Sequence, residues 1–182
     1  MSNIEKHSRK VRKLFQIFLV LTPLMVIYFW LTTNTPYNFI SNTGIFNLSF
    51  DIADLTQAPL TLTTRLLAMA ASLLYCAIIM YALTVLIKLF KNYEQNNIFT
   101  LENAQSYQKL GYCIFYWVGG GLLYEPIMSL ILTFNNPPGQ RMITISFIGF
   151  DFLTIVLGFI VLIISWVMKE GYQLADEQNY TI

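Results

Sequence analysis

Four long apolar runs predict an all-α integral membrane protein with four transmembrane helices and a small extracytoplasmic loop region. The runs cover about residues 14–31, 66–90, 110–134 and 147–168. Each is long enough to cross roughly 30 Å of hydrocarbon at about 1.5 Å per residue. Charged residues make up only 12% of the chain, where about 25% is usual in soluble proteins, so lipid is the expected solvent. The length of 182 residues is sufficient for one membrane domain, residues 1–182.

The first run follows a basic segment, as the apolar core of a secretory signal peptide also does. Its roughly 18 apolar residues exceed the 7 to 15 that are usual in a signal-peptide core. The sequence Leu31-Thr32-Thr33-Asn34 that follows offers no small-x-small cleavage site. We therefore expect an uncleaved membrane anchor.

The lysines and arginines between the runs predict the orientation in the membrane. Basic residues accumulate in cytoplasmic loops, and nine of the eleven lie before the first run, at or beside the connection between the second and third, or after the fourth. The opposite side has only Arg65 and Arg141. Both termini and the middle loop are therefore expected in the cytoplasm.

The first outer loop, about residues 32–65, is too long for a simple connection. Residues 37–40 and 45–50 favour β structure and flank the turn-like cluster 41–44, which fits a small hairpin. In the second outer loop, Met142 to Ile145 follow Pro137-Pro138-Gly139 and could add a strand to that hairpin. An irregular loop is the alternative.

Two sequence motifs flank the last two runs on the predicted cytoplasmic side. The middle loop carries the pattern L-F-x-x-Y-x-x-x-x-I-F-T-x-E-N, and the chain ends in an acidic-Glu-Gln-x-x-Thr-aliphatic tail. The matching residues are Leu89, Phe90, Tyr93, Ile98, Phe99, Thr100, Glu102 and Asn103, then Glu177, Gln178, Thr181 and Ile182.

These motifs resemble a bacterial membrane-protein family known as domain-of-unknown-function family 2975. The resemblance implies a location in the bacterial cytoplasmic (inner) membrane. Its members are often encoded beside short helix-turn-helix regulators, which implies, by association, a DNA-binding protein as cytoplasmic partner. Family members commonly carry Gly after the Tyr-Glu pair, where this chain has Gln95-Asn96-Asn97. Asparagine also adopts the left-handed turn conformation, so the resemblance in fold holds.

The middle loop predicts a short amphipathic helix that continues into the third span. Thr100 can cap a helix beginning at Leu101, and Glu102 in its first turn complements the positive helix end. Phe99 lies just outside as an apolar anchor. Two interpretations remain open, a structural collar at the membrane surface and a docking surface for a cytoplasmic partner.

The C-terminal tail has two similar interpretations. Asp176 and Glu177 can pack against the lysines of the middle loop, if the fourth helix continues past Gly171. Alternatively, the last residues, up to Ile182, can act as a peptide ligand that extends a partner's sheet.

Polar residues inside the spans form the other candidate site. Glu125 and Asp151 lie in apolar runs, where a charge is costly, so both are expected to face other helices. Glu125 precedes Pro126, which is expected to kink the third helix. Gly121, Glu125 and Ser129 share one face of the third helix.

Asp151 and Thr154 lie on one face of the fourth helix, together with Gly158 and Ser165. We expect this stripe to meet that of the third helix, and Arg65 lies within reach of Asp151 for an ion pair. Structural packing and a solute, ion or proton site are the two interpretations.

Two function classes follow. The first is a regulatory, sensory or partner-binding protein that uses its middle loop and tail. The second is a transporter or channel component that uses the two carboxylates and, with only four spans, requires a homo-oligomer. The chain has one histidine and no metal-ligand cluster, nucleophile elbow or phosphate loop, so we expect no enzyme activity and no cofactor. A net charge of +1 gives no reason to expect direct nucleic-acid binding.

Overall fold

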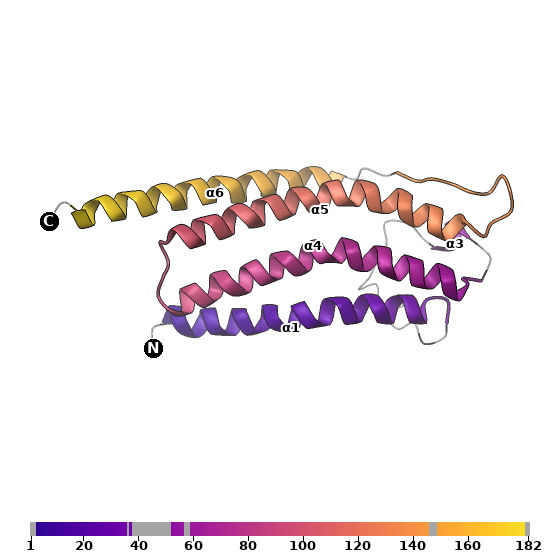
Figure 1. Ribbon diagram of the computed structural model, residues 1–182, viewed down its shortest axis with the longest axis horizontal. Coiled ribbons are helices and arrows are strands. Elements are labelled where there is room, and N and C mark those ends of the chain that lie inside the picture. The colour runs from indigo at the N-terminus through magenta and orange to yellow at the C-terminus, as the bar shows by residue number, and fades with distance from the viewer. Residues whose placement is uncertain (1–2, 36, 38–51, 57–58, 146–148, 181–182) are drawn as a thin grey trace. The chain divides into compact units, whose positions relative to one another are not determined.

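The computed structural model describes residues 3–35, 37, 52–56, 59–145 and 149–180. Four long helices follow one another along the chain, with the single turn α3, Ile52–Leu55, after the first of them (Figure 1). The long helices are α1 (Asn3–Thr32), α4 (Leu62–Glu94), α5 (Leu101–Thr133) and α6 (Gly149–Tyr180). All four are long and apolar enough to cross a membrane. The predicted architecture of four apolar helices is confirmed.

The helices are longer than the apolar runs that predict them. α1 begins eleven residues before Leu14, because lysine and arginine are good helix formers and continue the helix. α6 continues past Gly171 to Tyr180. α4 and α5 each have 33 residues, which corresponds to about 50 Å and exceeds the roughly 30 Å of bilayer hydrocarbon. Their terminal turns therefore project beyond the hydrocarbon.

Large apolar side chains cover the outside of the helices. In the most apolar 18-residue window of each span, only 11% to 22% of the residues are buried inside the protein. Leu74, Leu123 and Trp166 are 77%, 69% and 65% exposed. A water-soluble bundle would turn such residues inward, so this surface fits a multi-pass membrane protein surrounded by lipid.

The helices contribute to two compact units. Unit 1 contains Met1–Val20, Ile78–Val118 and Gly149–Ile182, and unit 2 contains Leu21–Ala77 and Gly119–Ile148. Unit 1 thus holds the connection between α4 and α5, together with α6. Unit 2 holds α3, the end of α1, the beginning of α4 and the end of α5.

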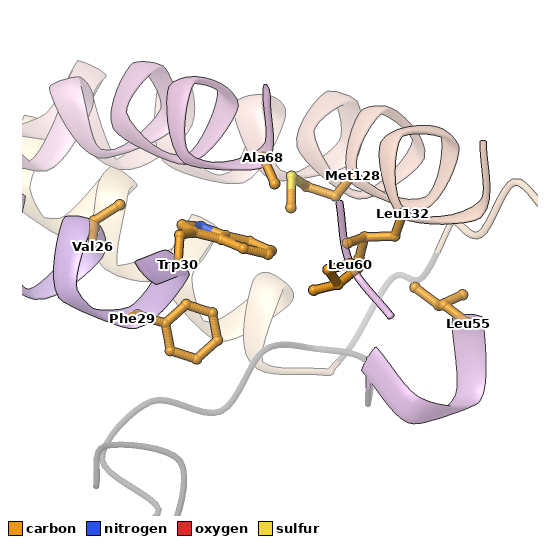
Figure 2. Close-up of a cluster of buried hydrophobic side chains, with 8 residues drawn as sticks. All are labelled: Val26, Phe29, Trp30, Leu55, Leu60, Ala68, Met128 and Leu132. Atoms are coloured by element: carbon orange, nitrogen blue, oxygen red, sulfur yellow. The ribbon is translucent and has the colours of Figure 1, made fainter. Parts of the chain in front are cut away.

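Unit 2 has a hydrophobic core around Trp30. The indole is 1% exposed, and Ala68 and Met128 are completely buried beside it. Figure 2 shows these three side chains pointing toward one another from α1, α4 and α5. Leu55 of α3 and Leu60 belong to the same cluster. α3 therefore contributes to the core of the second unit.

The α1–α4 and α5–α6 connections are described in part. The predicted hairpin over residues 37–50 lies, except for Tyr37, outside the described residues. Met142 to Ile145 are described and have irregular backbone rather than a strand. Gly139 adopts a left-handed φ of 92°, and the amide of Gln140 donates to the Pro137 carbonyl at 3.1 Å, which closes a turn there.

Candidate functional site

The connection between α4 and α5, residues 95–100, is called the clamp loop below. α4 ends in a Schellman motif: the amide of Asn97 donates to the Asn92 carbonyl at 3.0 Å, and that of Asn96 to the Tyr93 carbonyl at 3.1 Å. Asn96 occupies the left-handed position with a φ of 61°. Asparagine thus replaces the usual glycine at this helix end, as predicted.

Asn103 holds the clamp loop from inside. Its side chain is 0% exposed, and its amide nitrogen donates to the carbonyls of Asn97 at 2.6 Å and Ile98 at 2.8 Å. Its amide oxygen accepts a 2.8 Å hydrogen bond from the Asn92 side chain. Two loop carbonyls are thereby satisfied without water. The backbone N–H of Asn103 donates to the Thr100 hydroxyl at 3.2 Å, which confirms Thr100 as the cap of α5.

Glu94 connects the end of α4 to the basic segment of α1. Its carboxylate accepts a hydrogen bond from Arg9 and lies 2.9 Å from Arg12. The hydrogen bond from Arg9, together with the Arg12 charge, lowers the pKa of the Glu94 carboxyl below its ordinary value. A second contact joins the same elements, because the Asn96 side chain donates to Glu5 at 2.7 Å.

The contacts of Glu94 were not predicted from the sequence, where Arg9 and Arg12 indicated only the orientation in the membrane. More than 80 residues separate the partners, and no local pattern indicates that they meet.

Three further motif residues, Phe90, Tyr93 and Glu102, have partners within unit 1. Glu102 lies 2.7 Å from Lys88 and accepts a 2.9 Å hydrogen bond from Asn92. The hydroxyl of Tyr93 lies 2.8 Å from that of Tyr107. The ring of Phe90 makes edge contacts with Phe15 and Tyr93. These contacts fix the motif on the helices around it.

Two apolar side chains of this region remain on the surface. Phe99 is 64% exposed and Leu101 is 40% exposed, whereas Ile98 of the clamp loop is half-buried. Phe99 and Leu101 flank the α5 cap, so their backbone positions are fixed by the hydrogen bonds of Thr100 and Asn103. The result is an apolar surface, here called the Phe99 surface, on a firmly held loop.

α6 packs on the first half of α5 through its small and polar residues. The Ser165 hydroxyl donates to the Ala104 carbonyl at 2.8 Å. A Cβ added to Gly158 would lie 3.1 Å from the Phe115 ring, so the absence of a side chain permits close approach. This part of the predicted stripe therefore faces α5 within unit 1.

The remaining stripe residues belong to different units. Asp151 and Thr154 are half-buried in unit 1. Glu125 and Ser129 are 8% and 0% exposed in unit 2, as expected for residues that face other helices. The meeting of the two stripes stays a prediction.

Arg65 of unit 2 donates to the Leu31 carbonyl at 3.0 Å and the Leu60 carbonyl at 3.4 Å. It thereby satisfies an orphan carbonyl at the end of α1. The ion pair of Arg65 with Asp151 stays a prediction.

A hydrogen-bonded chain connects three helices inside unit 2. The Trp30 indole donates to the Ser72 hydroxyl at 2.8 Å, and that hydroxyl lies 2.8 Å from the hydroxyl of Tyr124. The Tyr124 ring stacks on Tyr75 at a centroid distance of 4.7 Å. Ser129 donates to the Pro126 carbonyl at 2.9 Å. In hydrocarbon no water is available, so polar groups must form hydrogen bonds within the protein, as these do.

Of the tail residues, only part is described. The Glu177 side chain is exposed. The side chain of Gln178, and residues Thr181 and Ile182, lie outside the described part. Within the described residues, no group of three or more His, Cys, Asp or Glu side chains is placed to hold a metal ion.

The fold and these contacts define a multi-pass membrane protein of four apolar helices. The family model described as "Protein of unknown function (DUF2975)" matches residues 52–182, and the chain belongs to this family. No curated protein and no solved structure shows significant similarity to the chain.

Proposed function

We propose that the protein binds a cytoplasmic protein partner through the Phe99 surface and has a regulatory or sensory role in the bacterial inner membrane. The observation that carries this proposal is the 64% exposure of Phe99 on a loop whose carbonyls at Asn97 and Ile98 are held by the buried Asn103. A rigid surface loses little conformational freedom when a partner binds. The partner that the family resemblance suggests is a helix-turn-helix regulator.

Orientation is part of the same proposal, because a cytoplasmic partner requires the clamp loop on the cytoplasmic side. The excess of basic residues near the termini and the clamp loop supports that side. Gln95 and Gln140 are both exposed and provide labelling positions. In a chain whose two native cysteines are replaced, cysteine at position 140 should react with an impermeant reagent in intact cells. Cysteine at position 95 should react only after lysis, and its labelling in intact cells would exclude this orientation.

The partner-binding proposal is tested with two exposed phenylalanines that flank α5. Phe99 is 64% exposed at one end and Phe134 is 68% exposed at the other. In mild detergent, with the regulator co-expressed, Phe99→Ala should abolish co-purification, whereas Phe134→Ala should retain it. Equal thermal stability of both variants shows that the loss does not come from unfolding. A wild-type protein that recovers no regulator would contradict the proposal for this partner.

A second candidate is an oligomeric transporter or channel component that uses Glu125 and Asp151. The burial of Glu125, directly before Pro126, favours it, because membrane-buried carboxylates often belong to ion or proton pathways. Glu125→Gln keeps the shape and hydrogen-bonding capacity but removes the charge. A transport role predicts loss of activity in a stably folded Gln variant, and a packing role predicts that only Glu125→Leu is harmful. Cellular phenotype and detergent stability, measured on both variants, separate the two.

A further inference from the structure

The basic residues of α1 divide into two groups that face different surroundings. Arg9 and Arg12 turn toward Glu94 within unit 1. Lys6, Lys10 and Lys13 are exposed, and in the described part of the chain no ion pair joins them to a carboxylate. The arginine charges are therefore compensated within unit 1, whereas the three lysines have no carboxylate partner among the described residues.

The three lysines share one face of the helix. Their spacing is i, i+4 and i+7, which places them in one row along α1. Ser8, which is 5% exposed, marks the opposite, buried face. The lysine row continues at the same spacing into Ile17 and Val20, which are 60% and 62% exposed. The lysines thus stand on the lipid-facing side of α1 and not on a side that meets another helix.

The position of the row along the helix fits the headgroup layer. The apolar run begins at Leu14, so Lys13 stands at the edge of the hydrocarbon. Lys6 lies seven residues earlier, which is about 10 Å along the helix axis. The headgroup region of one leaflet is on the order of 5 to 8 Å thick, and flexible lysine side chains adjust within it.

We propose that Lys6, Lys10 and Lys13 bind the headgroup of an anionic phospholipid, whose acyl chain lies along Ile17 and Val20. A ligand of this face must contact three positive charges and an apolar strip. An anionic lipid has a negative headgroup for the charges and an acyl chain for the apolar strip. An acidic soluble protein would match the charges but not the apolar strip inside the hydrocarbon. The site lies on α1, apart from the Phe99 surface, and is independent of the partner-binding proposal.

The test compares lipid retention by variants that lose equal charge. The protein is reconstituted in nanodiscs with equal amounts of phosphatidylcholine and phosphatidylglycerol, and lipids that stay bound after transfer to detergent are identified by native mass spectrometry. The wild type should retain phosphatidylglycerol preferentially. One surface lysine contributes about 1 kcal/mol, or about fivefold in affinity. The preference for phosphatidylglycerol should therefore be at least about tenfold weaker in the triple variant K6Q/K10Q/K13Q than in the wild type.

The matched control removes three other exposed lysines, as K91Q/K109Q/K169Q. It should keep most of the preference, because these lysines do not form a row on one face. K6R/K10R/K13R retains the charges and should also keep it, and higher salt should weaken it in the wild type.

Three results would overturn the proposal: no preference in the wild type, its retention in the α1 glutamine variant, or an equal loss in the control. If the triple glutamine variant fails to insert, the single variant Lys10→Gln decides, with about a fivefold decrease expected. An unchanged preference in that variant would equally refute the site.

Discussion

Replacing Asn103 with alanine should remove the hydrogen bonds that hold the clamp loop and destabilise the protein. The side chain is completely buried, donates to two loop carbonyls and accepts one hydrogen bond from Asn92. A net hydrogen bond contributes about 1 kcal/mol, and a buried group left unpaired costs about 1 to 3 kcal/mol. Because water at the membrane surface can reach part of the loop after the change, we expect a loss of about 2 to 4 kcal/mol in the free energy of unfolding.

The assay is reversible unfolding in mixed micelles, followed by far-UV circular dichroism, with Asn97→Ala as the control. Asn97 is an exposed asparagine of the same loop, and a surface substitution usually changes stability by less than about 0.5 kcal/mol. Asn103→Asp is informative as well, because it keeps the acceptor oxygen but loses the amide donor to both carbonyls. If Asn103→Ala behaves like Asn97→Ala, the loop does not depend on this side chain and the argument for a preorganised surface fails.

The remaining predictions concern the ion pair, the helix contact and the hydrogen-bonded chain. Folding lowers the pKa of the Glu94 carboxyl. The ionised carboxylate therefore stabilises the folded protein fully above the ordinary glutamate pKa of about 4.3. This stabilisation is lost as the pH falls through the lower pKa that Glu94 has in the folded protein. The stability difference between wild type and Glu94→Gln should therefore decrease below about pH 4.3 and stay constant at neutral pH, and thermal melts across pH measure it. Gly111→Ala should lower the free energy of unfolding by about 1 to 3 kcal/mol, because the new Cβ would lie 2.6 Å from the Leu162 side chain. A Cβ added to Gly119 would meet nothing within 4 Å, so Gly119→Ala should leave the free energy of unfolding unchanged or raise it. Ser72→Ala leaves the buried indole and phenol without their shared partner and should cost about 1 to 3 kcal/mol by the same unfolding assay. A neutral Gly111→Ala or Ser72→Ala variant would show that the corresponding contact does not form.

The helices were predictable because each one satisfies its own backbone. In hydrocarbon no water pairs with backbone N–H and C=O groups, so an apolar run of sufficient length must be helical whatever its neighbours are. The cap of α5 by Thr100 and the left-handed Asn96 are equally local, and both were found from neighbouring residues. The ends of α1 and α6 extend further than expected, because polar residues outside the membrane also continue a helix.

The contacts between helices could not be predicted in the same way. Ser72 on α4 contacts Trp30 and Tyr124, which come from two other helices, and no local pattern indicates that these three side chains meet. Which faces meet depends on the packing of the whole unit and not on any local spacing. The same applies to Glu94, whose arginines precede it by more than 80 residues.

The collar and docking interpretations of the clamp loop are compatible. Asn103 and Thr100 fix the backbone, and this internal fixation is what keeps Phe99 in one place at the surface. Preorganisation of this kind strengthens binding by reducing the ordering that a partner must impose. Asn103→Ala should therefore weaken partner binding and stability together, although Asn103 itself is buried and cannot touch the partner. Phe99→Ala should weaken binding alone. Asn103→Ala could instead lower stability and leave co-purification of the regulator unchanged. In that case partner binding would not depend on the fixed conformation of this loop, and the docking surface would lie elsewhere on the protein.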